Sequence, residues 1–242
     1  MSGHSKWNNI KRKKGASDAA RAKVFTKVAR EISVAVKEGG PDPASNGKLR
    51  DCIAKAKACN MPNDNIERCI KKAAGSDNKD AYEEIVYEGY GPSGVAVIVE
   101  TLTDNRNRTA GDLRHYFDKC GGNLGQNGCV SFLFTQTGLV LIDNPDEDLD
   151  EEKVMEDCFD VGAEDVNFEE GCVEVLCATA DLRAVREGLE AKGYTLTSAE
   201  AAYIPSTYTA IPEPELADKM AKLLDLLEDN DDVQSVWHNW EE

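Results

Sequence analysis

A run of four adjacent cations near the N-terminus is the feature of this sequence with the clearest chemistry. The run consists of Lys11, Arg12, Lys13 and Lys14. Adjacent cations repel one another, so a polyanion is the natural partner, and the alternative is a solvated tail. Trp7 lies nearby, and an aromatic ring beside cations can stack on an unpaired base or anchor the segment on a folded domain. The pattern favours binding to nucleic acid.

Two arginines in the segment 105–109 form a second basic cluster, at the start of a predicted helix. Positive side chains at a helix N-terminus oppose the helix dipole, so this placement costs some stability and suggests a function. The alternative is that Arg106 and Arg108 pair with Asp104, with Asp112 or with the acidic part of the chain. The sequence leaves both interpretations open.

Residues that catalyse reactions or bind metals are sparse. His4, His115 and His238 are the only histidines, and each is expected at the surface. The eight cysteines include no Cys-x-x-Cys pair and are expected to be mostly buried free thiols. The acidic run from Asp146 lacks the glycine that a calcium loop requires at its sixth position. We therefore predict a protein that is not an enzyme and has no cofactor and no metal site.

Charge is divided unevenly along the chain. Residues 1–79 contain 18 Lys and Arg against 8 Asp and Glu, a net charge of +10, whereas residues 80–242 contain 10 against 37, a net charge of -27. Salt screens charges over about 8 Å at physiological ionic strength. An acidic part that lies farther away than this barely lowers the affinity of the basic residues 1–79 for phosphate. We therefore expect nucleic acid as a partner of the basic part, and the acidic body offers a surface for a protein partner.

The cations must be positioned by helices in the first third of the chain. Residues 1–16 are predicted to be a flexible arm, and a helical apolar period follows until Gly39-Gly40-Pro41 ends it. Two more short amphipathic helices are predicted around residues 49–56 and 63–74. Arm and helices together form a predicted nucleic-acid-binding domain over residues 1–79.

Beyond residue 80 the apolar period changes from 3.6 to 2, which indicates strands. Two strands joined by a Gly-rich turn are predicted within residues 85–102, and a helix follows that ends at Gly121-Gly122. Residues 129–134 are expected to form another strand.

The remaining residues predict a domain inserted into another. Residues 138–205 follow the order strand, helix, strand, strand, helix, strand of a ferredoxin-like unit. The segment after it supplies a strand, a Leu-rich helix and a last strand. We therefore predict an α+β fold: a discontinuous α/β domain over 80–137 and 206–242, and an acidic ferredoxin-like domain over 138–205 inserted in it.

Seven segments of the sequence resemble the YebC/PmpR family, and the resemblance covers essentially the whole chain. These segments are Gly3–Trp7, Phe25–Lys27, Glu88–Pro92, Thr103–Thr109, Lys119–Gly125, Ile204–Thr207 and Leu227–Val233. The resemblance implies a helical N-terminal domain and two α/β domains, the third inserted in the second. The arm departs from the family pattern at Asn8, at its basic run and at Ala22, but it keeps its charge.

The resemblance implies two functions on one scaffold. Family members are described as DNA-binding transcriptional regulators, and others, such as the mitochondrial translational activator of cytochrome c oxidase I, relieve ribosome stalling at proline-rich stretches. No predicted helix carries Asn, Gln and Arg at base-reading spacing, which favours recognition of shape and phosphate and suits the second function. A small-molecule sensor or enzyme built on the ferredoxin-like domains ranks last.

We predict a cytoplasmic DNA-binding transcriptional regulator, or alternatively a ribosome-associated translation factor that binds rRNA or tRNA. No apolar run reaches the length of a signal peptide or a membrane span, so no membrane partner is expected. The sequence does not indicate an oligomeric state. The predicted nucleic-acid-binding residues are Lys6, Trp7, Lys11, Arg12, Lys13, Lys14, Arg21, Lys23, Lys27, Arg106 and Arg108.

Overall fold

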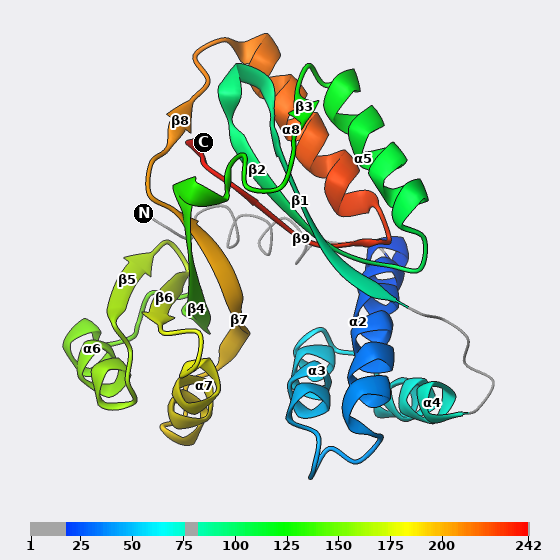
Figure 1. Ribbon diagram of the computed structural model, residues 1–242. Helices are drawn as coiled ribbons and strands as arrows, with labels where there is room; N and C mark the ends of the chain where they lie inside the picture. The colour runs from blue at the N-terminus through cyan, green and yellow to red at the C-terminus, as the bar shows by residue number, and fades with distance from the viewer. Residues whose placement is uncertain (1–17, 76–81, 242) are drawn as a thin grey trace. The chain divides into compact units, whose positions relative to one another are not determined.

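The computed structural model describes residues 18–75 and 82–241, which belong to two compact units (Figure 1). One unit holds residues 135–204, and the other holds the described residues on both sides of that segment. Helices come first and antiparallel sheets follow, so the predicted α+β class is confirmed.

Three helices at the start of the larger unit pack around a core of their own. They are α2 (Asp18–Gly39), α3 (Gly47–Ala58) and α4 (Asn63–Ala74). The buried apolar side chains of this core, among them Ile32, Leu49 and Ile66, all come from residues 28–73. The predicted helical periods are therefore confirmed, since each helix turns its apolar face toward the other two.

The turn between α2 and α3 is held by Asn46, the N-cap of α3. Its side-chain oxygen accepts the N–H of Leu49 at 3.0 Å, and its amide nitrogen donates to the carbonyls of Ala35 at 2.7 Å and Gly40 at 2.8 Å. A Cβ atom at Gly39 would lie 2.7 Å from this side chain. Glycine at this position therefore allows the close approach that fixes the direction of α2.

A four-stranded antiparallel sheet with two helices on one face forms the rest of the larger unit (Figure 1). Its strands, in the order β3-β1-β2-β9, are β3 (Asn123–Leu124), β1 (Glu83–Tyr90), β2 (Ala96–Thr103) and β9 (Val233–His238). The covering helices are α5 (Arg106–Lys119) and α8 (Pro214–Asp229). Two short strands, β8 (Thr209–Ala210) and β10 (Trp240–Glu241), pair in parallel beside it.

Residues 129–134 do not form the predicted strand. Ser131–Leu133 instead form a 3-10 turn, η2, because the buried carboxylate of Glu88 accepts the backbone N–H groups of Gly128, Val130 and Ser131 at 2.7 to 2.8 Å. These N–H groups are therefore not available for hydrogen bonds to a neighbouring strand. Burial alone would raise the pKa of Glu88, but the hydrogen bonds from these three amides outweigh it and hold the pKa below its ordinary value.

The smaller unit is a four-stranded antiparallel sheet in the order β5-β6-β4-β7, which is the ferredoxin-like order. Its elements are β4 (Phe134–Asp143), α6 (Glu151–Asp160), β5 (Asp165–Glu169), β6 (Cys172–Cys177), α7 (Leu182–Ala191) and β7 (Leu196–Pro205). Residues 135–204 contain 4 Lys and Arg against 19 Asp and Glu, a net charge of -15. This unit therefore holds 19 of the 45 acidic residues of the chain but only 4 of its 28 Lys and Arg.

His238 does not lie at the surface as predicted. It belongs to β9, where it pairs with Val97 of the central strand β2, and only 3% of it is exposed. Its Nδ1 atom accepts the N–H of Trp240 at 3.3 Å. His238 is thus buried although β9 is an edge strand of this sheet, whereas His115 on α5 is exposed as predicted.

Candidate nucleic-acid interface

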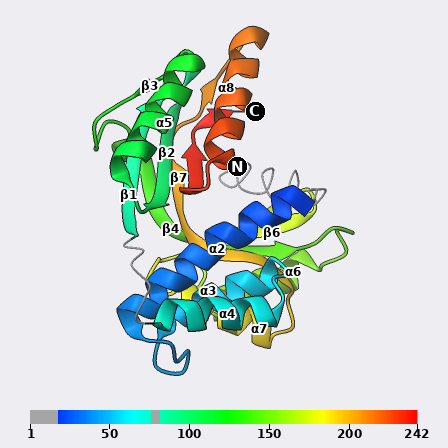
Figure 2. The ribbon, with the colours of Figure 1, turned by 90° about the vertical axis from the view of Figure 1, so that its right-hand side faces the viewer.

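The helix α2 lies near the C-terminal end of α8 (Figures 1 and 2), and three cations on one face of α2 contact residues 228–232. We call Lys23, Lys27 and Arg30 the α2 cation row, because residues four and seven apart share a helix face. Lys23 Nζ lies 2.9 Å from Asp229 Oδ1, and Lys27 Nζ donates to the carbonyl oxygen of Glu228 at 2.6 Å. The carboxylate of Asp229 carries a full negative charge and the last carbonyls of a helix carry a partial one, so both contacts are electrostatically favourable.

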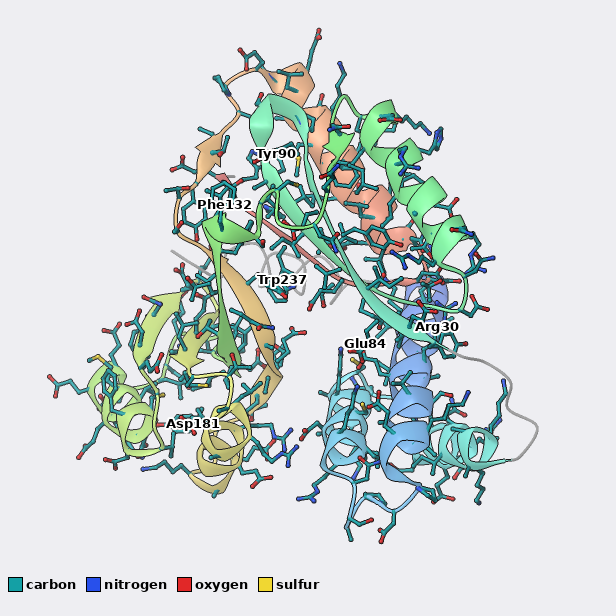
Figure 3. The ribbon with its side chains drawn as sticks, viewed as in Figure 1. Arg30, Glu84, Tyr90, Phe132, Asp181 and Trp237 are labelled. Atoms are coloured by element: carbon teal, nitrogen blue, oxygen red, sulfur yellow. The ribbon has the colours of Figure 1, made fainter. Side chains whose placement is uncertain are left out.

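Arg30 makes the most buried contact of the row (Figure 3). Its Nη1 atom donates to Asp232 Oδ1 at 2.6 Å and to the carbonyl oxygen of Asp231 at 2.7 Å. The guanidinium also lies 5.6 Å from the centre of the Tyr82 ring, within the range of a cation–π contact. Only 18% of the Arg30 side chain is exposed against 43% of that of Lys23, so this contact is screened less by salt than the Lys23–Asp229 pair.

The carboxylate of Asp232 is the centre of this site. Its Oδ2 atom accepts hydrogen bonds from Arg108 Nη2 at 2.7 Å, from Thr109 Oγ1 at 2.7 Å and from Thr103 Oγ1 at 3.2 Å, while Oδ1 accepts from Arg30. Burial alone would raise the pKa of Asp232, but these hydrogen bonds outweigh it and the pKa lies below its ordinary value. One carboxylate thus connects α2, α5, β2 and the start of β9.

Arg108 has two acidic partners. Its Nη2 atom contacts Asp232 and also Asp104 Oδ1 at 2.8 Å, and hydrogen bonds to both carboxylates raise the pKa of Arg108. The interpretation that Arg108 pairs with Asp104 is confirmed, and Asp232 is a partner that the sequence did not indicate. Arg106 is exposed, and its carbonyl oxygen accepts the hydroxyl of Tyr87 at 3.4 Å.

A charged cleft of about 460 Å³ lies where these elements meet. Its lining is polar and carries both signs of charge, so it can hold charged chain segments but offers no apolar pocket. The lining residues are Lys23, Arg30, Asp104, Arg108, Asp112, Asp229, Asn230, Asp231 and Asp232.

The predicted binding residues fall into three groups. The side chains of the first group lie outside the described residues: Lys6, Trp7, Lys11, Arg12, Lys13, Lys14 and Arg21, although the backbone of Arg21 belongs to α2. Lys23, Lys27 and Arg108 are brought together beside residues 228–232. Arg106 does not line the cleft.

Sequence reasoning missed Arg30 and Asp232. Arg30 follows Lys23 by seven residues, which is two helical turns, so helical spacing alone could have placed it in the α2 cation row. Asp232 belongs to the segment Leu227–Val233 that carries the family resemblance, but nothing in its local spacing indicates partners more than 100 residues away.

Metal-binding clusters and membrane helices are both missing from the part of the chain that the structure describes. There, no three His, Cys, Asp or Glu side chains are grouped so that they could hold a metal ion. Likewise, none of the described helices is both long and apolar enough to cross a membrane.

Two family models match this chain and together cover most of it. The model of the TACO1/YebC N-terminal domain matches residues 5–76, and the model of the TACO1/YebC second and third domain matches residues 82–240.

Relatives and a solved structure agree with these matches. Proteins named "probable transcriptional regulatory protein" from Ruminiclostridium cellulolyticum and Finegoldia magna are each 58% identical to this chain, covering all of it and 97% and 99% of their own lengths. The crystal structure of a conserved hypothetical protein from Aquifex aeolicus is 46% identical, with a TM-score of 0.84 over 93% of this chain and 91% of that one. This chain therefore belongs to the TACO1/YebC family.

Proposed function

We propose that this protein is a DNA-binding regulator of transcription, without enzymatic activity, that acts in the cytoplasm and binds the phosphate backbone through its arm and α2. The observation that supports this proposal best is the α2 cation row, in which every member already binds an oxygen atom. Contacts from Lys and Arg to phosphate oxygens are of the same kind. The name that its relatives carry, transcriptional regulatory protein, points in the same direction.

The predicted arm and the first part of α2 follow each other in the sequence, and both are basic. Residues 1–30 contain 9 Lys and Arg against a single acidic residue, Asp18, so their net charge is +8. Each phosphate that such a segment neutralises releases counterions, which makes the affinity strongly dependent on salt. We assign Lys6, Trp7 and the run from Lys11 to Lys14 to this interface.

The salt dependence of DNA binding tests the proposal. With about six phosphate contacts, the logarithm of the association constant for a duplex DNA should fall linearly with the logarithm of the salt concentration, with a slope of about -5. Replacing Lys11, Arg12, Lys13 and Lys14 by alanine should make that slope shallower by about three to four. Lys219→Ala with Lys222→Ala, two exposed positions on α8, is the control and should leave the slope unchanged. An unchanged slope in the arm variant would remove the arm from the interface.

A ribosome-associated translation factor is the second candidate. The lysines of the α2 cation row are equally compatible with it, since a lysine ammonium is a point charge that binds DNA and RNA phosphates alike and reads no base. Sedimentation of the tagged protein from a lysate, with and without ribonuclease, separates the candidates. Co-migration with ribosomes that ribonuclease abolishes supports the translation factor, whereas ribonuclease-insensitive enrichment on particular promoter DNA supports the transcriptional regulator.

A further inference from the structure

We propose that the end of α8 occupies the α2 cation row in place of phosphate and competes with nucleic acid for it. We define the α8 acidic end as residues 228–232, which contain Glu228, Asp229, Asp231 and Asp232. The inference rests on the proposed function, and it adds that nucleic acid and the α8 acidic end cannot bind Lys23 and Lys27 at the same time. The ligand is the phosphate backbone, and the competitor is part of the same chain.

The geometry of the contact imitates a strand of phosphates. Lys23 holds Asp229 Oδ1 at 2.9 Å and Lys27 holds the Glu228 carbonyl oxygen at 2.6 Å, while Arg30 holds two oxygens, the Asp231 carbonyl at 2.7 Å and Asp232 Oδ1 at 2.6 Å. Lys23 and Lys27 are four residues apart and Lys27 and Arg30 are three apart, about 6 Å and about 4.5 Å along the helix axis, so the oxygens are bound in succession along α2. A polyanion laid along α2 would present its oxygens to the same three side chains.

The contact is polar and can therefore be exchanged. The buried apolar residues of the helical core lie within residues 28–73 and those of the core beneath α5 and α8 lie within residues 95–236, so no described apolar cluster joins them. In the Lys23–Asp229 pair the two side chains are 43% and 74% exposed, and exposed pairs of this kind are weak and screened by salt. A polyanion of high charge density can displace Asp229 from Lys23 at little cost.

The exchange stops at Arg30. Asp232 is 3% exposed and also binds Arg108, Thr109 and Thr103, so removing Arg30 would leave a buried carboxylate without one of its two cations. Arg30 therefore anchors α2 to the sheet while the two lysines change partner. Nucleic acid would bind the outer part of the α2 cation row and leave the Arg30–Asp232 pair in place.

Removing the competitor tests the proposal. Asp229→Asn should tighten binding to a short mixed-sequence duplex DNA at low salt by about two- to fivefold, which corresponds to the loss of one exposed ion pair. Asp218→Asn changes the charge of α8 equally, but this exposed residue lies at the other end of the helix, and the change should alter affinity by less than about 1.5-fold. In a Lys23→Ala background Asp229→Asn should give no gain, because its effect passes through Lys23.

Chemical shifts supply a measurement that does not depend on variants. Adding the same duplex to the wild-type protein should shift the backbone amide signals of residues 228–232. Because a polyanion repels this acidic segment, such a shift would report the loss of its contacts with Lys23 and Lys27. Unmoved signals, or equal effects of Asp229→Asn and Asp218→Asn, would overturn the competition while leaving DNA binding intact. If neither the wild type nor any variant binds the duplex in a salt-dependent manner, the proposed function fails, and the competition fails with it.

Discussion

Asp232 and Glu88 are both buried carboxylates with a lowered pKa in the larger unit, but their partners differ. Asp232 binds two arginines and two threonines that come from α2, α5 and the end of β2. Glu88 binds three backbone amides within the four residues 128–131. One carboxylate connects distant segments through charged side chains, and the other shapes a single loop through the main chain.

The difference shows which of the two contacts can respond to other ions. A guanidinium or ammonium can leave its carboxylate for a phosphate or a chloride ion, whereas a backbone N–H can leave only if the loop itself moves. Salt should therefore weaken the contact of Asp232 with the half-exposed Arg108 more than its contact with the buried Arg30, and leave the loop at Glu88 almost unaffected.

The largest expected effect comes from Asp232→Asn. Removing the charge leaves Arg30 partly buried without its carboxylate, so the free energy of unfolding should fall by about 2 to 4 kcal/mol, and by less in high salt. Urea unfolding followed by tryptophan fluorescence measures this in a Trp7→Phe background, where the signal comes from Trp237 and Trp240. The control Asp231→Asn changes an exposed side chain and should cost less than about 0.5 kcal/mol. Equal costs would contradict the role of Asp232.

Glu88→Gln should have a smaller effect. An amide keeps one acceptor oxygen but turns its NH₂ group toward at least one of the amides of Gly128, Val130 and Ser131. Burying such unsatisfied donors costs about 1 to 3 kcal/mol. The same urea experiment measures the cost, which should not change between low and high salt. A cost that disappears at high salt would show that charge, and not main-chain geometry, fixes this loop.

Acid should produce the smallest effect. The pKa of Asp232 and that of Glu88 are lower in the folded protein than in the unfolded chain, so each contribution to stability is complete above the ordinary pKa and is lost as the pH falls through the folded value. Between about pH 6 and pH 3 the wild type should therefore lose more stability than Asp232→Asn or Glu88→Gln. Parallel pH profiles for all three proteins would mean that neither carboxylate is coupled to folding.

The local spacing of residues predicted the helices and most strands, but it could not predict contacts between residues that are distant in the sequence. The apolar period of α2 and its end at Gly39 could be predicted because both depend on neighbours within a few residues. The pair between Arg108 and Asp104, four residues apart, could be predicted for the same reason. Asp232, 124 residues from Arg108 and 202 from Arg30, could not, because no local pattern encodes which strand end reaches which helix.

The loop after α5 illustrates the same limit. Residues 129–134 have the composition of a strand, and they would have formed one if only their own side chains mattered. Instead, the carboxylate of Glu88, about 40 residues earlier, accepts hydrogen bonds from the backbone N–H groups of Gly128, Val130 and Ser131. A single buried acceptor in one strand thus decides the conformation of a distant segment.

The separate core of α2, α3 and α4 has a consequence for synthesis of the protein. This core needs no residue beyond 73, but Asp229 and Asp232 are made about 200 residues after Lys23 and Arg30. At about 5 to 20 residues per second, the growing polypeptide carries its cations unpaired with these acids for roughly 10 to 40 s, while it is still attached to the ribosome. Synthesis of residues 228–232 then ends this strongly basic stage, because these residues supply the partners of Lys23, Lys27 and Arg30.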